Sequence, residues 1–126
     1  MTDDAERQAL LAIGVITVAS GATQAVAPGT LLGALNVENT DATRQLFGTV
    51  GMFMVVVGGL LTAATRRPGA GRDVVFWTSL QKLGAAGAVA LGVRRAVFAP
   101  RALLVAGFDF LSGLIALDYW RRLGRP

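Results

Sequence analysis

The chain contains neither cysteine nor histidine among its 126 residues. The absence of cysteine excludes disulfide bonds, cysteine-ligated iron–sulfur clusters and thiol catalysis. The absence of histidine excludes bis-histidine haem ligation, histidine-ligated metal sites and a catalytic histidine base. We therefore expect neither a metal site nor a cofactor.

Charge is also scarce, because charged residues make up 16% of the chain and hydrophobic residues 53%. A typical soluble domain carries about 25% charged residues. The charges gather at the ends of apolar runs, whereas a soluble helix spreads them along one face. This pattern is typical of helices that are surrounded by lipid.

One uncharged run, Leu46–Thr65, contains no proline and has arginines on both sides, Arg44 before it and Arg66 and Arg67 after it. At about 1.5 Å per residue, a helix of this length matches the roughly 30 Å hydrocarbon core of a bilayer. Three further apolar segments lie at about residues 9–27, 74–93 and 102–120. The sequence therefore predicts an all-α fold, a single integral membrane domain in which short loops join four transmembrane helices.

Proline and glycine mark the end of the first helix, at Pro28 and Gly29. We interpret the apolar residues 29–37 as a segment at the membrane interface or a partly re-entrant one. Thr40 or Asp41 is a suitable N-cap for the second helix.

Two segments of the chain resemble one another. Residues 25–34 (AVAPGTLLGA) and 97–106 (VFAPRALLVA) share Ala-Pro, Leu-Leu and Ala at matching positions. Duplicated helical hairpins produce such a pattern in repeat-built membrane proteins. Chance similarity in a chain rich in alanine and leucine is the alternative.

An even number of spans places both termini on the same side of the membrane. The loops and tails of that side carry Arg7, Arg66, Arg67, Arg72, Arg121, Arg122 and Arg125, and those of the other side carry Arg44, Arg94, Arg95 and Arg101. Cytoplasmic loops carry an excess of Lys and Arg. We therefore expect a multi-pass protein of the cell membrane with cytoplasmic N- and C-termini.

Two charged residues interrupt the last two apolar segments, Lys82 and Asp109. A charge at mid-bilayer costs about 2.5–3.5 kcal/mol on insertion scales, so such residues face the bundle interior and find a partner. If the intervening turn is centred near Pro100, Lys82 lies level with Asp118; if it is centred nearer Ala96, Lys82 lies midway between Asp109 and Asp118, with Arg94 or Arg95 above them. We predict a network of these residues. It either fixes the register of the helices or forms a proton or ligand site with neighbours such as Gln81 and Ser112.

Small residues are abundant in all the predicted helices. Since lipid tails are as apolar as leucine, membrane helices associate through small residues and hydrogen bonds. We expect close helix packing at Gly48, Gly51, Gly58, Gly84, Gly87 and Gly113. The alternative role, for the polar members of the same stripes, is to line a cavity, and these members are Thr17, Gln24, Gln81 and Ser112.

Motifs of catalysis and nucleotide binding are missing from the sequence. No Gly-rich turn ends in Lys-Ser or Lys-Thr, and no serine sits in a nucleophile elbow. The arginines form no basic stripe for nucleic acid. We expect contact with membrane lipid and assembly with a second copy or a partner membrane subunit.

The length, the four predicted spans and the Pro-Gly–Leu-Leu segment at residues 27–32 resemble the small four-helix bacterial membrane proteins of the DoxX-like kind. The resemblance implies a four-helix membrane protein, and because it includes no specific motif it implies no functional residue. Some DoxX-like proteins are tied to redox complexes, a role that the lack of His and Cys puts in doubt. We expect a non-enzymatic structural or partner subunit. The alternative is a small transporter or channel for a proton, ion or small amphiphile that uses Lys82 and Asp109.

Overall fold

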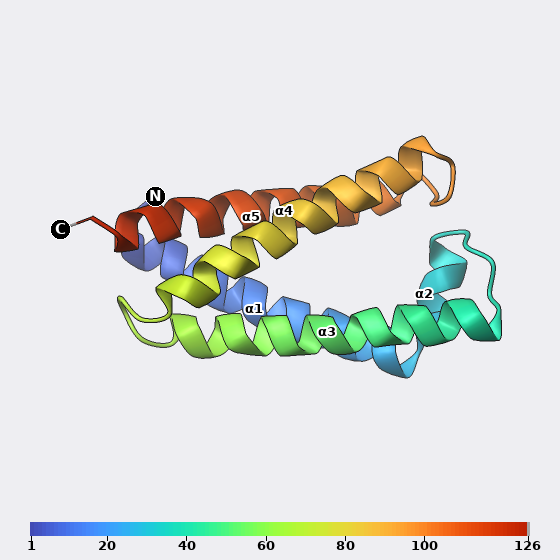
Figure 1. Ribbon diagram of the computed structural model, residues 1–126, viewed down its shortest axis with the longest axis horizontal. Coiled ribbons are helices and arrows are strands. Elements are labelled where there is room, and N and C mark those ends of the chain that lie inside the picture. Colours follow the sequence, from blue (N-terminus) through green and yellow to red (C-terminus); the bar gives the residue numbers. More distant parts are fainter. Residues whose placement is uncertain (126) are drawn as a thin grey trace.

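The computed structural model describes residues 1–125, and the elements in that range are all helices (Figure 1). They are α1 (Asp3–Val26), α2 (Pro28–Ala34), α3 (Asp41–Thr65), α4 (Arg72–Arg94) and α5 (Ala102–Leu123). Four of them, α1, α3, α4 and α5, are long and apolar enough to span a membrane. The predicted all-α fold with four long apolar helices is therefore confirmed.

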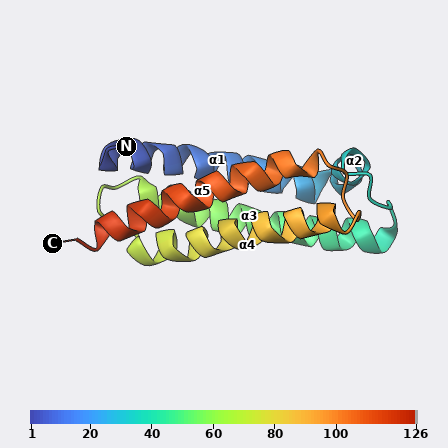
Figure 2. The same ribbon diagram turned by 90° about the horizontal axis from the view of Figure 1, so that it is seen from above.

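The long helices form two antiparallel hairpins, with α1 beside α3 and α4 beside α5 (Figures 1 and 2). Both chain termini and the α3–α4 loop lie at one end of the bundle, which we call the terminal end. The short helix α2 and the α4–α5 turn lie at the other end, which we call the α2 end. A backbone hydrogen bond of 2.9 Å, from the N–H of Ala99 to the carbonyl of Leu35, joins the hairpins there.

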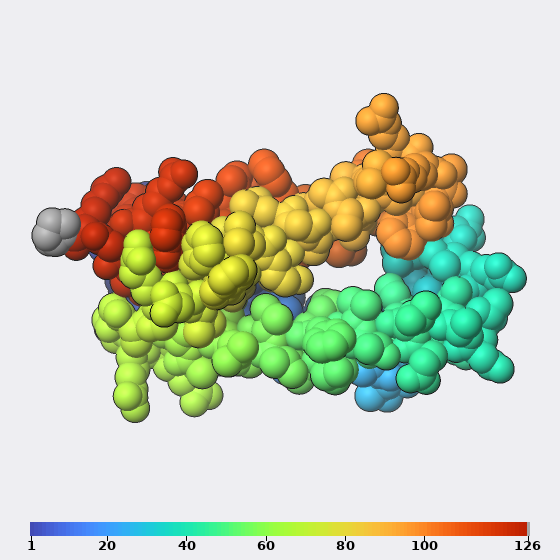
Figure 3. Space-filling view, viewed as in Figure 1, coloured from blue at the N-terminus to red at the C-terminus, as the bar shows by residue number. Residues whose placement is uncertain are grey.

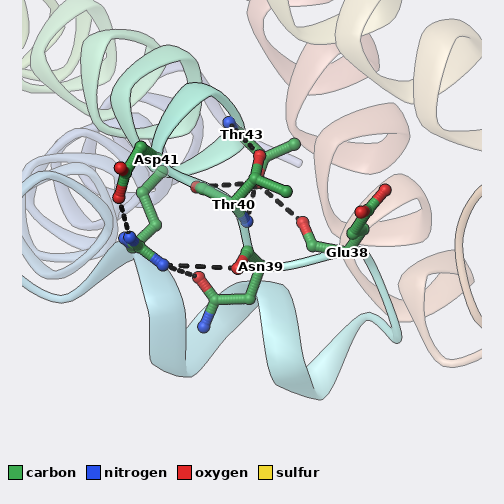
Figure 4. A network of polar contacts seen from close by, with 6 residues as sticks. Glu38, Asn39, Thr40, Asp41 and Thr43 are labelled. Carbon is green, nitrogen blue, oxygen red and sulfur yellow. Dashed lines mark hydrogen bonds and ion pairs between the residues drawn. The ribbon is translucent and has the colours of Figure 1, made fainter.

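The first two long helices begin one to two turns earlier than the apolar runs predict, because polar caps extend them. The Thr2 side chain accepts a hydrogen bond of 3.1 Å from the N–H of Ala5 at the start of α1. Thr40 and Thr43 form a reciprocal capping box at the start of α3 (Figure 4). Each cap satisfies N–H groups that the first helical turn leaves without partners.

The segment after the first long helix folds as α2, with Pro28 at its first position, where the missing N–H costs nothing. The helix stops at Leu35, and Asn36 adopts a positive φ of 60°. Pro100, the counterpart of Pro28, lies in the turn before the much longer α5. The two similar segments thus precede helices of very different length, and an origin by duplication stays a prediction.

Glycines bring α1 and α3 into backbone contact. A Cβ added to Gly58 would lie 2.8 Å from the carbonyl oxygen of Gly14, and one added to Gly51 would lie 2.6 Å from that of Gly21. Gly113 packs against Leu83 of α4, and Gly48 makes an ordinary contact with Ala25. These four predicted packing glycines therefore face neighbouring helices.

Packing by Gly84 and Gly87 does not occur within the chain. Both are exposed, and a Cβ added to either would meet nothing within 4 Å. Within the run from Gly84 to Ala88, Ala86 alone is buried. The reason is geometric, because five consecutive small residues cover all sides of a helix and only one side can face α5.

The apolar core lies at the terminal end. There Leu10 and Ile13 of α1 pack with Leu61 of α3, Val75 of α4, and Ala116 and Tyr119 of α5. Towards the α2 end the hairpins diverge, and the space-filling view shows a hollow between α3 and α4 (Figure 3). The bundle is therefore closed at the terminal end, and towards the α2 end it has a lateral opening between α3 and α4.

Candidate functional site

A buried ammonium group joins three of the long helices. Lys82 of α4 is 3% exposed, and its Nζ donates a hydrogen bond of 3.1 Å to Oδ1 of Asp109 on α5. The same Nζ donates a hydrogen bond of 2.8 Å to the hydroxyl of Thr17 on α1. The structure thus brings Lys82 and Asp109 together and adds a hydrogen-bond partner, Thr17, from the other hairpin.

Helical spacing explains why the two charges face inward. Lys82 continues the buried face of α4, which consists of Val75, Thr78, Ser79, Lys82 and Ala86. Asp109 lies on the buried face of α5 with Ala102, Ala106, Ser112, Gly113, Ala116 and Tyr119. Residues three and four apart share one side of a helix. Each charged side chain therefore points into the interior together with the other buried residues of its helix.

Contacts one turn away fix the register of the pair. The Ser79 hydroxyl donates a hydrogen bond of 3.3 Å to the carbonyl of Gly113. Leu83 packs directly on Gly113, and there is no room between them for a side chain at position 113. Because α4 and α5 meet so closely at Gly113, Lys82 and Asp109 lie level with each other.

The ion pair opens onto a cavity of about 580 Å³ between the two hairpins. Its polar lining comes mainly from α1, with Thr17, Ser20, Thr23 and Gln24 beside Lys82 and Asp109. The apolar lining includes Leu31 of α2, Met54 of α3, and Leu104, Val105 and Phe108 of α5. The cavity therefore has an ion pair and hydroxyl groups on one part of its wall and hydrocarbon on the rest.

The electrostatics of the site are those of a neutral pair. The Phe108 ring centroid lies 5.4 Å from Nζ of Lys82, within the range in which a ring face attracts a cation. For a helix in a bilayer, an isolated charge at mid-span costs about 2.5–3.5 kcal/mol on insertion scales, and pairing with an opposite charge reduces that cost. A bound molecule would thus meet hydrogen-bonding groups with no net charge.

The remaining members of the predicted network lie elsewhere. Asp118 accepts a hydrogen bond of 2.9 Å from Nε of Arg122, two to three turns along α5 from Asp109. Arg94 and Arg95 are exposed at the end of α4, about 18 Å along the helix from Lys82. Neither forms an ion pair within residues 1–125. The pairing is therefore with Asp109, and a larger network with Asp118, Arg94 or Arg95 does not form.

The geometry of the α4–α5 turn explains this correction. The N–H groups of Val97 and Phe98 both donate to the carbonyl of Gly92, with distances of 2.8 and 3.2 Å. These bonds fold the start of the loop back over the end of α4. The hairpin is consequently centred near Arg95 and Ala96, rather than at Pro100, and this centre puts Lys82 level with Asp109.

Of the polar residues expected at a cavity, Thr17 and Gln24 line it, whereas Gln81 and Ser112 do not. Gln24 also donates a hydrogen bond of 2.9 Å to the carbonyl of Phe47. The Oε1 of Gln81 and the Oγ of Ser112 are buried without a hydrogen-bond partner among the described residues. Ser112 lies one turn from Asp109 on the same buried face of α5, and Gln81 directly precedes Lys82 on α4, but neither side chain reaches the cavity.

Sequence reasoning missed a second polar cluster, at the terminal end. Arg122 lies 3.3 Å from Asp3, 3.6 Å from Glu6 and 2.9 Å from Asp118. Glu6 is 3% exposed. The signal was present, because the stripe through Thr17 and Gly14 reaches Leu10 and Glu6 when it is continued towards the N-terminus. In residues 1–125 no group of three or more potential ligand residues is arranged to hold a metal ion.

Together, these features define an all-helical protein of four long apolar helices with a buried Lys–Asp pair beside an inter-hairpin cavity. Comparisons with models of known protein families, with curated proteins and with solved structures found no match for the chain.

Proposed function

We propose that the chain is a multi-pass membrane protein that binds a small amphiphile in the cavity between its hairpins and catalyses no reaction. The single observation that carries this proposal is the buried Lys82–Asp109 pair in the wall of a cavity of about 580 Å³ whose other walls are largely apolar. Ligand pockets of roughly 300–1,000 Å³ typically combine an apolar lining with a few polar groups that fix orientation.

The chemistry of the cavity favours an uncharged head group. Lys82 is already paired with Asp109, so an anionic or a cationic head group would be attracted by one member of the pair and repelled by the other, and would gain little net attraction. A hydroxyl or carbonyl oxygen instead accepts a hydrogen bond from Lys82 or from the hydroxyls of α1 without changing the charge of the site. The apolar tail would lie against residues such as Leu104 and Val105.

This proposal includes an orientation. Seven arginines lie in or beside the loops and tails of the terminal end, and four lie at the α2 end; the seven are Arg7, Arg66, Arg67, Arg72, Arg121, Arg122 and Arg125. By the positive-inside rule, the terminal end faces the cytoplasm. The cavity then opens towards the outer half of the bilayer.

Decanol and decanoate are suitable probes, because they share a tail and differ in head-group charge. We expect the purified wild-type protein in detergent to retain decanol in preference to decanoate, as measured by native mass spectrometry. Asp109→Asn leaves Lys82 without its counter-charge and should reverse the preference. An unchanged preference in this variant would contradict the proposal.

A steric variant tests the location of the ligand independently. Val105→Trp places a large ring at the cavity wall and should reduce decanol retention at least several-fold. Leu111→Trp, at an exposed position of the same helix, is the matched control and should retain decanol like the wild type. Equal retention by both variants would place the bound decanol outside the cavity.

A more specific form of this proposal is that the protein also transports what it binds. A carrier or channel for a proton, ion or amphiphile would use the same Lys82–Asp109 pair, since ionisable residues within membranes mark such pathways. Asp109→Asn should then abolish flux in proteoliposomes while leaving helicity unchanged. Full flux in this variant would remove the pair from the pathway.

A second candidate function is that of a structural or partner subunit, and an outer groove favours it. The groove has a volume of about 460 Å³ and lies between α4 and α5, where Gly87 and Gly107 leave the backbone uncovered. Small residues of this kind allow another membrane helix to approach closely. Gly107→Leu should then reduce oligomer or complex formation in cross-linking, whereas Lys82→Met with Asp109→Leu should not. Relationship to the DoxX-like proteins stays a prediction.

A further inference from the structure

The outer seam between α1 and α3 contains a second groove. Its lining differs in chemistry from that of the cavity beside the ion pair. Its volume is about 510 Å³, and its walls include Val15, Val18 and Ala19 of α1, Gly59 and Ala63 of α3, and Arg66, which follows α3. Apart from Arg66, this lining is small and mostly apolar. Of these residues, only Ala19 also lines the cavity beside Lys82.

The groove exists because Gly58 and Gly59 face different ways. Gly58 is buried against Gly14 and closes the helix contact, whereas a Cβ added to Gly59 would meet nothing within 4 Å. The missing side chain at Gly59 therefore leaves a hollow where the seam faces outward. From Gly59 to Arg66 the hollow extends for about 10 Å along α3.

A cation stands at one end of this hollow. Arg66 is the residue directly after α3, at the terminal end, and Arg67 follows it; both are exposed. Within residues 1–125, neither forms an ion pair with an acidic side chain. A positive group at the level where an apolar groove ends matches the layout of a phospholipid, whose charge sits above its acyl chains.

At the opposite end of the same seam, the arginine is paired with an acidic side chain. There a cavity of about 750 Å³ contains Arg44, but this arginine pairs with Asp41 and donates a hydrogen bond of 2.6 Å to Asn39 (Figure 4). Residues 45, 52 and 59 of α3 and the next such position, Arg66, are seven apart, so both hollows lie along one side of the helix. Charge complementarity thus distinguishes the two ends and favours an anionic head group at Arg66.

We propose that this groove binds an anionic phospholipid, with the phosphate at Arg66 and one acyl chain along Val15, Val18 and Gly59. The occupant is a lipid of the leaflet at the terminal end, and it is independent of the ligand between the hairpins. Each basic residue near a membrane surface adds about 1 kcal/mol of attraction to anionic lipid, and Arg66 also holds the head group over a shaped groove.

Competition between dioleoylphosphatidylglycerol and dioleoylphosphatidylcholine tests the proposal. The full chain is purified in mild detergent, and the lipid retained from an equimolar mixture is counted by native mass spectrometry. Arg66→Gln should reduce the preference for phosphatidylglycerol about five-fold. Arg95→Gln, which removes an exposed arginine at the α2 end, should leave the preference at the wild-type value.

Filling the groove should act on both lipids. Gly59→Leu is expected to reduce retention of phosphatidylglycerol and phosphatidylcholine alike, because the leucine occupies the place of the acyl chain. Gly84→Leu, at an exposed glycine that lines no groove, is the matched control. If Arg66→Gln behaves like Arg95→Gln, or if Gly59→Leu behaves like Gly84→Leu, the groove is not the lipid site. Should Gly59→Leu lose helicity, the arginine pair decides alone, since both arginines are exposed.

Discussion

Gly21 of α1 and Gly51 of α3 face each other across the first hairpin with no room for a side chain on either. A Cβ on Gly21 would lie 2.5 Å from the carbonyl oxygen of Gly51, and a Cβ on Gly51 would lie 2.6 Å from that of Gly21. The backbones therefore touch, and contacts of this kind between small residues are those by which helices associate in membranes through dispersion.

Gly51→Ala should therefore destabilise the hairpin, although alanine is the better helix former. Overpacking of a close contact costs about 1–3 kcal/mol. Gly59→Ala, two turns along the same helix, places its Cβ in open space and should be neutral or stabilise the helix by up to about 1 kcal/mol. Unfolding in mixed micelles, followed by circular dichroism, measures both. Equal stability of the two variants would contradict the close contact at Gly51.

The Lys82–Asp109 pair should behave as a unit. Lys82→Met leaves a buried carboxylate without its counter-charge, and Asp109→Leu leaves a buried ammonium, so either change alone should cost about 3–5 kcal/mol. The double variant removes both charges and should recover most of that loss. A double-mutant cycle of unfolding free energies measures the coupling. Additive losses would show that the two charges do not stabilise one another.

Arg122 should hold the terminal end together. Its guanidinium contacts Asp3 and Glu6 of α1 and Asp118 of α5, so Arg122→Gln leaves three acidic side chains near one another. We expect a lower melting temperature for Arg122→Gln than for Arg121→Gln, which removes an exposed neighbouring arginine. Adding Glu6→Gln to Arg122→Gln should restore part of the loss, because one buried carboxylate is then neutral. Failure of this rescue would show that Glu6 contributes no repulsion.

The proposed orientation has a direct test, because the absence of cysteine makes single labels unambiguous. Glu38→Cys, at the α2 end, should react with a membrane-impermeant maleimide in intact cells. Ala70→Cys, in the α3–α4 loop, should react only after permeabilisation. The reverse pattern would place the termini outside and the proposed phospholipid in the outer leaflet.

How far the sequence predicts the structure differs from helix to helix. On α5 the expected inward-facing residues Asp109, Ser112 and Gly113 are all buried, because they lie with Ala102, Ala106 and Ala116 on the only face of the helix that this spacing turns inward. On α4 the contiguous small residues gave no such face, and so the expected packing at Gly84 and Gly87 did not follow. Periodicity predicts burial only where polar or bulky residues mark the other sides.

The candidate site shows the same limit. Two charges in apolar helices predict that they face inward, but the partner of Lys82 depends on the register of the hairpin. That register is set by backbone hydrogen bonds to Gly92 and by the contact of Leu83 with Gly113. Neither leaves a pattern in the sequence. For Glu6 the sequence does hold a signal, since the buried stripe of α1 leads to it, but the signal is not decisive because an acidic residue in a first helical turn is also explained by the helix dipole.

The placement of Lys82 and Asp109 on consecutive helices has a consequence for biogenesis. Each charge alone would oppose release of its helix from the translocon into lipid. Since only a short turn separates α4 from α5, the opposite charges meet as soon as these two helices fold against each other. In the proposed membrane protein, the two charges within α4 and α5 would therefore enter the bilayer as a neutral pair, and the Thr17 hydroxyl would join the ammonium only when the two hairpins assemble.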